Sequence, residues 1–434
     1  MKLSAYHKSC GDEVTFVRGR NLEAAAGYWD RIYIASLFTY DWKKVLEAVH
    51  FFTDNLFGVS AGKVFVGGIA ATLLPDRLLN ETGISPVRGP ILSARQLGED
   101  KDTNIDELVP DYGVLTQVSH EYRYGAAFLA RATRGCIRNC KFCAVGTIEP
   151  EGCDYIDVKP IVRGIKEQIG DQRKLLLLDN NVLASPRLAD IVADVAALGF
   201  ERGAKLNGGQ REVDFNQGLD ARLVSESAVK LLARLPLKPV RLAYDRFVDA
   251  KVFERAVERV ADAGFKSLSN YLLYNFEDEP ADLWKRMHHC MELGDRLDVR
   301  IWSFPMRYVP IADSVRGFVG THWNPRLLRG VQCVSLVTKG TISARHDFFH
   351  TAFGETPEQF LEILSMPDRY IIQRSAHREN GAREWNELFR SLNADERADL
   401  WRLASAKGRV GLEQARDEAS TEKLKIMLNH YIEI

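Results

Sequence analysis

The sequence predicts an α/β fold: a partial (β/α)6 barrel of the TIM type, with a Rossmann-like α/β domain before it and a helical segment after it. Residues 119–340 alternate short apolar runs with helical patterns six times, which is the rhythm of strand–helix units. Residues 1–118 hold two further apolar runs around a helical pattern, and residues 341–434 are helical and rich in charge. These three ranges are the predicted domains.

The N-terminal domain is predicted from one strand–helix–strand unit. Ile32–Ser36 is a short apolar run, residues 42–52 carry apolar side chains at helical spacing, and residues 63–68 form a second apolar run that ends in two glycines. Strands that alternate with helices favour a parallel sheet. The glycine pair is typical of a tight turn and, alternatively, of a place where a ligand meets a sheet. The polar residues 95–115 are predicted to form a linker.

The barrel domain is predicted from six strands with helical patterns between them. The predicted strands are Tyr124–Leu129, Leu175–Leu178, Gly218–Arg222, Val240–Tyr244, Ser267–Tyr274 and Val299–Met306, and the helices are Ile161–Ile169, Ala189–Leu198, Ala228–Leu235, Phe253–Ala263 and Leu283–Leu293. Active sites of such barrels lie at the carboxyl ends of the strands. Polar residues that directly follow a predicted strand are therefore the candidates for function.

The C-terminal segment has four apolar periodic stretches, at residues 357–364, 382–392, 394–403 and 412–432, which predict helices. Acidic residues interrupt its basic ones, which are Arg369, Arg374, Arg378 and Arg383. This mixture favours a solvated helix face over a nucleic-acid contact. The segment is predicted either to cap the barrel or to hold a partner.

Composition indicates a cytoplasmic protein with a sizeable core. The chain has 434 residues, of which 46% are hydrophobic and 27% are charged, and its net charge of −1 excludes an overall basic field. No apolar run has the length of a membrane span, and the first residues lack the apolar stretch of a signal peptide. Three of the seven cysteines are clustered, which indicates a reducing compartment rather than a disulfide framework.

The strongest functional signal is the cluster of Cys136, Cys140 and Cys143, with an aromatic residue, Phe142, before the third cysteine. Three thiolates this close on one loop are suited to bind three irons of a [4Fe–4S] cube. The fourth iron then has no nearby protein ligand, which suits a cluster that binds and reduces a small molecule. We therefore predict one [4Fe–4S] cluster.

Two other readings of these cysteines stay open. A structural zinc site needs four ligands, and Cys153 is the one further cysteine nearby. The three residues are otherwise free thiols. An auxiliary cluster built from Cys153, Cys290 and Cys333 is disfavoured by their isolated spacing, and Cys290 lies in an amphipathic pattern typical of a core residue.

The run from Arg134 to Cys143 resembles the signature of the radical S-adenosylmethionine (radical SAM) superfamily. The resemblance implies that SAM chelates the open iron and that its reductive cleavage releases a 5′-deoxyadenosyl radical. It also implies an adenine contact for Phe142, an external reductant such as flavodoxin or ferredoxin, and an oxidoreductase-type reaction. It covers about half the chain strongly and the first hundred residues weakly.

Polar residues that follow two predicted strands are candidates for SAM contacts. Asp179, Asn180 and Asn181 end the run Leu175–Leu178 and resemble a D-D-N variant found in the cobalamin-type branch of the family. The alternative is a helix N-cap or a turn. Further candidates near the next two strands are Asn216, Gln217, Asp220, Arg222 and Asp245, with structural hydrogen bonds or a helix cap as the alternative.

The position of the N-terminal domain resembles that of cobalamin-binding radical SAM proteins. In that branch a D-x-H-x-x-G motif supplies a histidine to cobalt, and none of the ten histidines lies in such a motif. We therefore expect a degenerate domain without cobalamin.

The predicted function is a radical SAM enzyme that abstracts hydrogen from a metabolite, peptide or nucleic acid. Alternatives are a cobalamin-dependent methyltransferase, a non-catalytic iron–sulfur sensor and a zinc-binding module. A methylthiotransferase is disfavoured, because it needs three more cluster cysteines and only Cys10 precedes Cys136.

Overall fold

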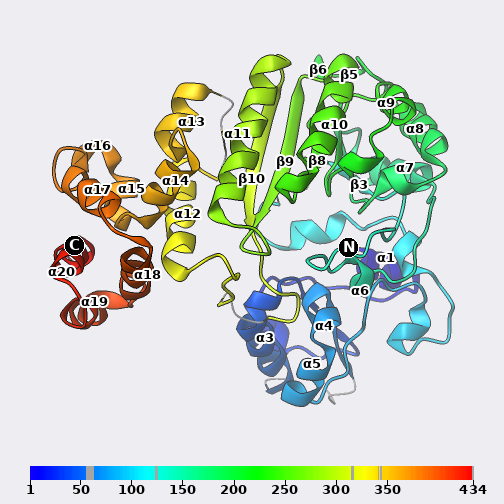
Figure 1. The fold of residues 1–434 in the computed structure, drawn as a ribbon. Coiled ribbons are helices and arrows are strands. Elements are labelled where there is room, and N and C mark those ends of the chain that lie inside the picture. Colours follow the sequence, from blue (N-terminus) through cyan, green and yellow to red (C-terminus); the bar gives the residue numbers. More distant parts are fainter. Residues whose placement is uncertain (55–62, 123–125, 314–316, 341, 343–344, 433–434) are drawn as a thin grey trace. The chain divides into compact units, whose positions relative to one another are not determined.

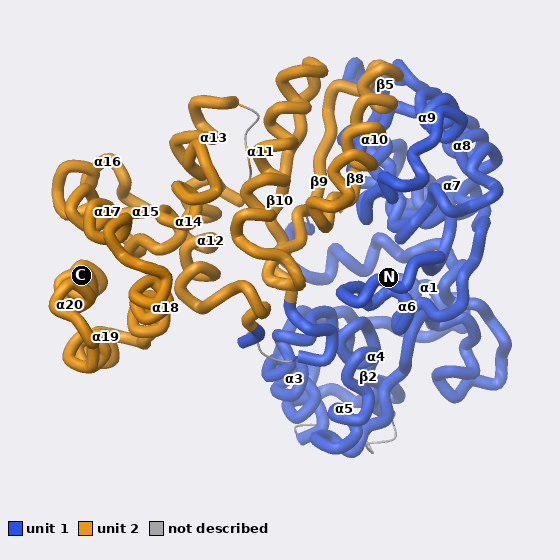
Figure 2. Tube along the Cα trace, in the orientation of Figure 1, with its two compact units in different colours: residues 1–241, 309–318 blue, residues 242–308, 319–434 orange. Residues whose placement is uncertain are grey.

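The computed structural model describes residues 1–54, 63–122, 126–313, 317–340, 342 and 345–432 of the chain (Figure 1). They form a mixed α/β fold with several small parallel sheets. The chain divides into two compact units (Figure 2). The first comprises residues 1–241 and 309–318, and the second comprises residues 242–308 and 319–434. No helix among the described residues is both long enough and apolar enough to cross a lipid bilayer.

The first unit begins with a two-stranded parallel sheet and its helices. Strands β1 and β2 pair in register from Ile32 opposite Val64 to Ser36 opposite Gly68. Apolar residues of α3, including Trp42 and Val49, are buried in the core beside this sheet. The elements are α1 (Lys2–Ser9), α2 (Leu22–Ala26), β1 (Ile32–Ser36), η1 (Thr39–Asp41), α3 (Trp42–Asp54), β2 (Val64–Gly68), α4 (Ile69–Leu73) and α5 (Pro75–Thr82).

The glycine pair that ends β2 allows a close approach between backbones. Gly68 has φ 93°, and a Cβ atom there would lie 2.2 Å from the carbonyl oxygen of Ser36. The Ser36 hydroxyl donates a hydrogen bond to the carbonyl of Gly67 at 2.7 Å and accepts one from the amide of Ala71 at 2.9 Å. The pair is thus the tight turn that leads from β2 into α4, as the sequence indicated.

Residues 94–117 contain three 3-10 helices between the small sheet and the barrel region: η3 (Ala94–Leu97), η4 (Ile105–Glu107) and η5 (Gly113–Gln117). Ala94, Leu97 and Ile105 are buried against Tyr6 of α1. The predicted linker is therefore an ordered segment, because its apolar residues are buried against α1.

A three-stranded parallel sheet with the order β3-β4-β7 follows in the first unit. Leu175, Leu176 and Leu177 of the central strand are buried. Helices α7 and α8 contact each other, and α7 contacts β3. The elements are β3 (Phe128–Ala130), α6 (Val145–Ile148), α7 (Val158–Ile169), β4 (Lys174–Leu177), η6 (Val182–Ala184), α8 (Leu188–Ala197), β5 (Lys205–Leu206), β6 (Gly209–Gln210), β7 (Glu212–Phe215), η7 (Ala221–Leu223) and α9 (Glu226–Leu232).

Two predicted strands differ from those observed. The strand predicted at Gly218–Arg222 is wrong: β7 occupies Glu212–Phe215, where Val213 and Phe215 point into the core. Gly218 has φ 94°, and Asp220 caps η7, so the chain turns at these residues instead of extending. The first strand begins at Phe128, and residues 124 and 125 of the predicted strand lie outside the described part of the chain.

A second three-stranded sheet has the order β10-β9-β8. Strands β9 and β10 are parallel, in register from Ser267 opposite Arg300 to Tyr274 opposite Arg307, and α11 packs against both. The elements are β8 (Val240–Ala243), η8 (Phe247–Asp249), α10 (Ala250–Asp262), β9 (Ser267–Tyr274), α11 (Pro280–Arg296) and β10 (Arg300–Arg307). The predicted strands here are confirmed within one residue at each end, while closure of six strands into a partial barrel stays a prediction.

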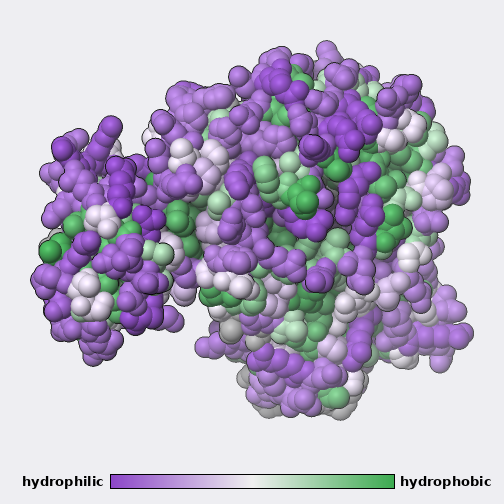
Figure 3. Space-filling model, in the orientation of Figure 1, coloured by the Kyte–Doolittle hydropathy of each residue, from purple (hydrophilic) through white to green (hydrophobic). Residues whose placement is uncertain are grey.

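The remaining elements of the second unit are helices, and their face in Figure 3 is mostly hydrophilic with scattered apolar residues. They are α12 (Pro325–Val337), α13 (His346–Phe353), α14 (Pro357–Ser365), α15 (Asp368–Ile372), α16 (Arg374–His377), α17 (Ala382–Arg390), α18 (Ala394–Leu403), α19 (Gly408–Asp417) and α20 (Glu422–Ile432). The single helical stretch predicted at 412–432 is observed as parts of two helices, α19 and α20, with residues 418–421 between them. The Thr421 hydroxyl caps the start of α20 by accepting a hydrogen bond from the amide of Leu424. The predicted domain limits at residues 118 and 340 stay predictions.

Candidate functional site

The three clustered cysteines lie on a loop that follows β3 and is closed at its base. The amides of Arg134 and Cys153 each donate a hydrogen bond to the other residue's carbonyl, at 2.9 and 3.0 Å. Gly135 has φ 75°, and a Cβ atom there would lie 3.1 Å from the Cα atom of Gly152. The two ends of the loop are therefore held together by backbone contacts.

The cysteines differ in exposure and in their hydrogen bonds. Cys136 and Cys140 are half-buried and Cys143 is exposed. The Cys136 sulfur accepts hydrogen bonds from the amide of Arg138 and from Nδ2 of Asn181, both at 3.4 Å. These two N–H donors hold the sulfur in place beside the end of β4, and cysteine sulfur is the usual ligand of cluster iron. The residues present therefore fit a cluster ligand at Cys136.

A single metal ion does not fit these cysteines. Among the described residues, no three His, Cys, Asp or Glu side chains converge closely enough to hold one ion. In a [4Fe–4S] cube each thiolate binds a different iron, so the three sulfurs do not need to meet at one point. This observation concerns a single ion only, so the cluster and the zinc alternative both stay predictions. Cys153 itself donates its thiol hydrogen to the carbonyl of Tyr155 at 3.2 Å.

Glu149 connects the cysteine loop to the end of β4. Its side chain is 8% exposed, and Oε2 accepts hydrogen bonds from the amide of Gly135 at 2.8 Å and from Nδ2 of Asn180 at 2.7 Å. Oε1 accepts one from Arg131. Glu149 is not among the predicted site residues, because nothing in the local sequence distinguishes it from the exposed Glu151 two residues later.

Glu149→Ala is expected to lower the free energy of unfolding by about 2–3 kcal/mol, because it leaves the Gly135 amide and the Arg131 guanidinium without their acceptor. Urea unfolding followed by circular dichroism measures this loss. Glu151→Ala is the matched control and is expected to change stability by less than about 0.5 kcal/mol. Equal unfolding midpoints for the two variants would contradict the connecting role of Glu149.

Asp179 joins the carboxyl ends of β3 and β4. Its side chain is fully buried, and Oδ1 accepts hydrogen bonds from the amide of Ala132 at 2.9 Å and from both the amide and the hydroxyl of Thr133. Oδ2 is buried without a hydrogen-bond partner among the described residues. Burial raises the pKa of Asp179 to about 6, although the bonds from Thr133 and Ala132 oppose the rise.

Asp179→Asn is expected to make the protein more stable above pH 6 and to have little effect at pH 4. Between an ordinary pKa of 3.8 and about 6, the folded wild type retains a proton that the unfolded chain has lost. The free energy of unfolding of the wild type therefore falls by roughly 3 kcal/mol as the pH rises from 3.8 to about 6. An asparagine cannot ionise and keeps the Oδ1 acceptor. Urea unfolding at pH 4.5, 6 and 8 measures the difference, and a difference independent of pH would contradict the prediction.

Asp220 forms an ion-pair network with Arg222 and Arg138. Asp220 Oδ1 lies 2.6 Å from Arg222 Nε, and Oδ2 lies 2.9 Å from Arg138 Nε on the cysteine loop. Burial alone would raise the pKa of Asp220, but Arg222 and Arg138 outweigh it and hold that pKa below its usual value. Asp220 raises the pKa of Arg222 in turn, and the Cys140 thiol adds to this effect. The network thus brings the turn after β7 to the cysteine loop.

The other predicted site residues are placed as follows. Asn180 is bonded to Glu149, and Asn181 precedes η6 without a side-chain cap. Asn216 is half-buried and Gln217 is exposed in the turn after β7, while Phe142 is half-buried on the loop. Asp245 belongs to the second unit, where its carbonyl accepts a hydrogen bond from Arg286 at 2.9 Å. Contacts in the described structure therefore connect Asn181, Asp220 and Arg222 to the loop that holds Cys136 and Cys140. The SAM-binding role of all the predicted site residues stays a prediction.

Comparisons with known proteins give structural similarities only. No protein-family model matches the chain, and no curated protein matches it in sequence. One similar solved structure is the radical S-adenosylmethionine methyltransferase TsrM from Kitasatospora setae, with cobalamin and a [4Fe–4S] cluster bound. The similarity has 14% identity, covers 73% of this chain and 69% of TsrM, and has a TM-score of 0.46.

A second similar structure is Streptococcus suis SuiB bound to the precursor peptide SuiA, with 13% identity, coverage of 49% of this chain and 46% of SuiB, and a TM-score of 0.34. The expected absence of cobalamin stays a prediction, and the TsrM structure itself contains cobalamin. Both similarities are distant, and one of the two solved structures is described as a radical SAM methyltransferase.

Proposed function

We propose that the protein is a radical SAM enzyme that holds one [4Fe–4S] cluster on Cys136, Cys140 and Cys143. When bound, the cluster supplies the electron that cleaves SAM to a 5′-deoxyadenosyl radical. The observation that carries the proposal is the meeting of the cysteine loop with the polar end of β4, where Asn181 donates to the Cys136 sulfur. Free thiols without a metal-binding role do not require such a hydrogen bond.

Two buried acceptors support a SAM contact at the end of β4. Asp179 Oδ2 and Asn181 Oδ1 have no hydrogen-bond donor among the described residues. A buried acceptor without a donor costs free energy of about 1–3 kcal/mol. The amino group of SAM is a donor of the kind that these oxygens lack. We assign Asp179 and Asn181 the task of orienting that group.

The arginines of the Asp220 network have a different task. Arg222 lies close to the Cys140 thiol and pairs with Asp220, and Arg138 joins the same carboxylate from the loop. Their positive charges would complement the negative charge of a thiolate-bound cluster on this loop. We also propose the six-stranded partial barrel as the enclosure that keeps water from the radical, and flavodoxin or ferredoxin as reductant.

Anaerobic reconstitution with iron and sulfide tests the proposal. We expect about four irons and four sulfides per chain, and 5′-deoxyadenosine when dithionite and SAM are added, quantified by chromatography. One zinc without sulfide would identify a zinc module instead. Iron and sulfide without any cleavage of SAM, and without any change in the EPR signal of the cluster on adding SAM, would identify a sensor.

Cobalamin is tested in the same preparation. Hydroxocobalamin is added before gel filtration, and the absorbance spectrum of the protein fraction is recorded. Retained cobalamin would select methyl transfer as the reaction. Its loss during filtration would leave hydrogen abstraction from the substrate as the reaction that we propose. We assign any cobalamin that is retained to the predicted N-terminal domain, residues 1–118.

A further inference from the structure

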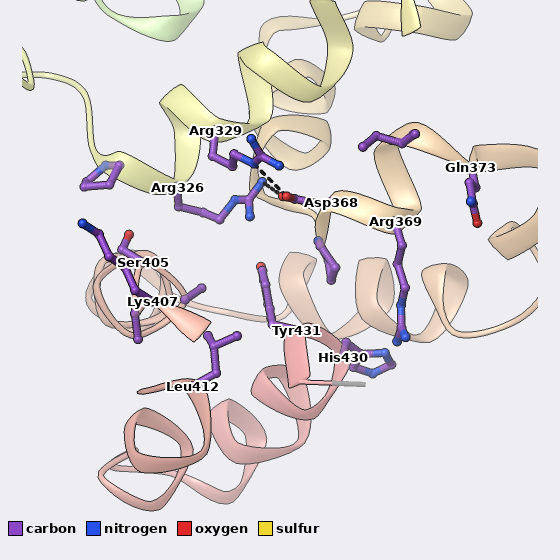
Figure 4. A pocket seen from close by; sticks show the side chains of 15 residues that line it. Arg326, Arg329, Asp368, Arg369, Gln373, Ser405, Lys407, Leu412, His430 and Tyr431 are labelled. Carbon is purple, nitrogen blue, oxygen red and sulfur yellow. Dashed lines mark hydrogen bonds and ion pairs between the residues drawn. The ribbon is translucent and has the colours of Figure 1, made fainter. Parts of the chain in front are cut away.

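The helices of the second unit enclose a pocket that the proposed SAM chemistry does not use. The cavity has a volume of about 630 Å³, which lies in the range of small-molecule sites. Figure 4 shows its lining side chains, which come from α12, α15, α19, α20 and the loop at residues 404–407. All of these elements belong to one unit.

The lining of this C-terminal pocket combines positive charge with apolar walls. Its basic side chains are Arg326, Arg329, Arg369, Lys407 and His430, and its one acidic side chain is Asp368. The apolar walls are formed by Pro325, Pro367, Ile372, Ala404, Ala406, Leu412 and the ring of Tyr431. Even with His430 neutral, four cations face one carboxylate. The pocket therefore carries an excess of positive charge in a confined space.

Arg326 is the central residue of the pocket because it is buried and only partly satisfied. Its side chain is 5% exposed, and Nη2 lies 2.8 Å from Asp368 Oδ1. That contact is an ion pair, and Nη2 and Nε of Arg326 are both buried without a hydrogen-bond acceptor among the described residues. Burying a guanidinium is costly unless its N–H groups are bonded. Arg326 thus presents donors that an anion would satisfy.

Asp368 does not neutralise the pocket, because it is shared. Arg329 Nε donates to Asp368 Oδ2 at 2.7 Å, while Arg326 approaches the other oxygen (Figure 4). One carboxylate therefore serves two guanidinium groups. A second anion at this place would complete the pairing, and the planar guanidinium fork suits carboxylate and phosphate groups alike.

A purely structural ion pair explains less of this arrangement. Such a pair would connect α12 to α15, and Arg329 with Asp368 already does so. It gives no reason for a second, buried arginine with an unsatisfied Nε, nor for the lysine at the other side of a cavity with apolar walls. Polar donors in an apolar cavity are the usual features of a ligand site.

We propose that the C-terminal pocket binds a small organic anion, in which a carboxylate or phosphate group on an apolar body meets Arg326. The apolar body would pack against Leu412 and the Tyr431 ring, and Lys407 would add charge at the exposed side of the pocket. The proposal concerns a second site and does not depend on cluster binding or on SAM cleavage.

Binding of phenyl phosphate and of benzoate to the full chain tests the proposal, by isothermal titration calorimetry with benzyl alcohol as the neutral probe. We expect one of the anions to bind at one site per chain, benzyl alcohol to bind at least about tenfold more weakly, and added salt to weaken the anion. Whichever anion binds more tightly identifies the preferred oxyanion group.

Variants then locate the site. Arg326→Met is expected to weaken binding at least about tenfold, and Lys407→Ser about threefold. Arg409→Ser is the matched control, since Arg409 is exposed, pairs with Glu413 and does not line the pocket. It is expected to bind like the wild type. Circular dichroism reports whether each variant is folded.

Several outcomes would overturn the proposal. They are the absence of saturable binding of either anion at 10 mM probe, equal binding of benzyl alcohol, and equal binding by wild type and by folded Arg326→Met. If Arg326→Met does not fold, Lys407→Ser and Arg329→Gln decide instead, because both residues are exposed. Unchanged affinity in these two variants would then reject the site.

Discussion

Replacing Cys140 by alanine is expected to abolish the cleavage of SAM while the chain stays folded. Two remaining thiolates cannot hold a cube that needs three, so iron should fall from about four per chain to less than one. Production of 5′-deoxyadenosine should fall at least about a hundredfold. Cys140 is half-buried on a loop, so its truncation leaves no large cavity in the core. Iron and sulfide analysis and chromatography of the reaction mixture provide the measurements.

Two cysteine variants are the controls for this result. Cys10→Ala removes an exposed thiol outside the loop and is expected to change neither iron content nor cleavage. Cys153→Ala removes the nearby thiol that a four-ligand zinc site would need, and its backbone bonds to Arg134 remain. Retention of about four irons in Cys153→Ala supports three protein ligands. Full activity of Cys140→Ala would contradict the proposed cluster.

Arg286→Met is expected to cause the largest loss of stability in the second unit, about 3–5 kcal/mol. Arg286 is fully buried in α11, and its guanidinium donates to the carbonyls of Tyr244 and Asp245 and to Asp278 Oδ2 at 3.0 Å. Its removal leaves Asp278 buried without its ion-pair partner. Burial already raises the pKa of Asp278 even with Arg286 present.

Urea unfolding of Arg286→Met and of Arg296→Met tests this prediction. Arg296 lies on the same helix but is half-exposed, and it pairs with Glu254 and Glu258 at the surface. Its replacement is expected to cost less than about 1 kcal/mol, since exposed ion pairs contribute little. Similar losses in the two variants would show that burial does not set the strength of the Arg286 pair.

Strands were predictable where an apolar run is bounded by polar residues. The run Ile32–Ser36 and the run Ser267–Tyr274 are observed as predicted. Strand β9 is mostly buried and the apolar residues Ile32–Ile34 of β1 are half-buried, so both strands keep the apolar side chains by which a strand is recognised. β7 was displaced in the prediction, because its alternating pattern in Glu212–Phe215 is only four residues long. The dense polar residues that follow it form a turn and a cap, which have no periodicity.

Site residues were predictable only where they are close together in the sequence or directly follow a strand. The three cysteines are near in sequence, and polar residues such as Asn181 directly follow a strand. Glu149 and Arg286 escaped prediction, because their partners are set by tertiary contacts. The C-terminal pocket escaped for the same reason, since its lining residues come from separate helices and one loop.

The paired amides and carbonyls of Arg134 and Cys153 have a consequence for the order of events during maturation. Holding the two ends of a loop together costs chain entropy, and here that cost is met while the polypeptide folds. For the proposed cluster, we expect iron to reach a loop whose two ends these backbone bonds already hold, with Cys143 exposed on it. Small zinc domains differ, since metal binding itself drives their folding. We therefore expect the proposed cluster to be added late to a folded chain, so that chelation should remove the iron and leave the circular dichroism spectrum unchanged.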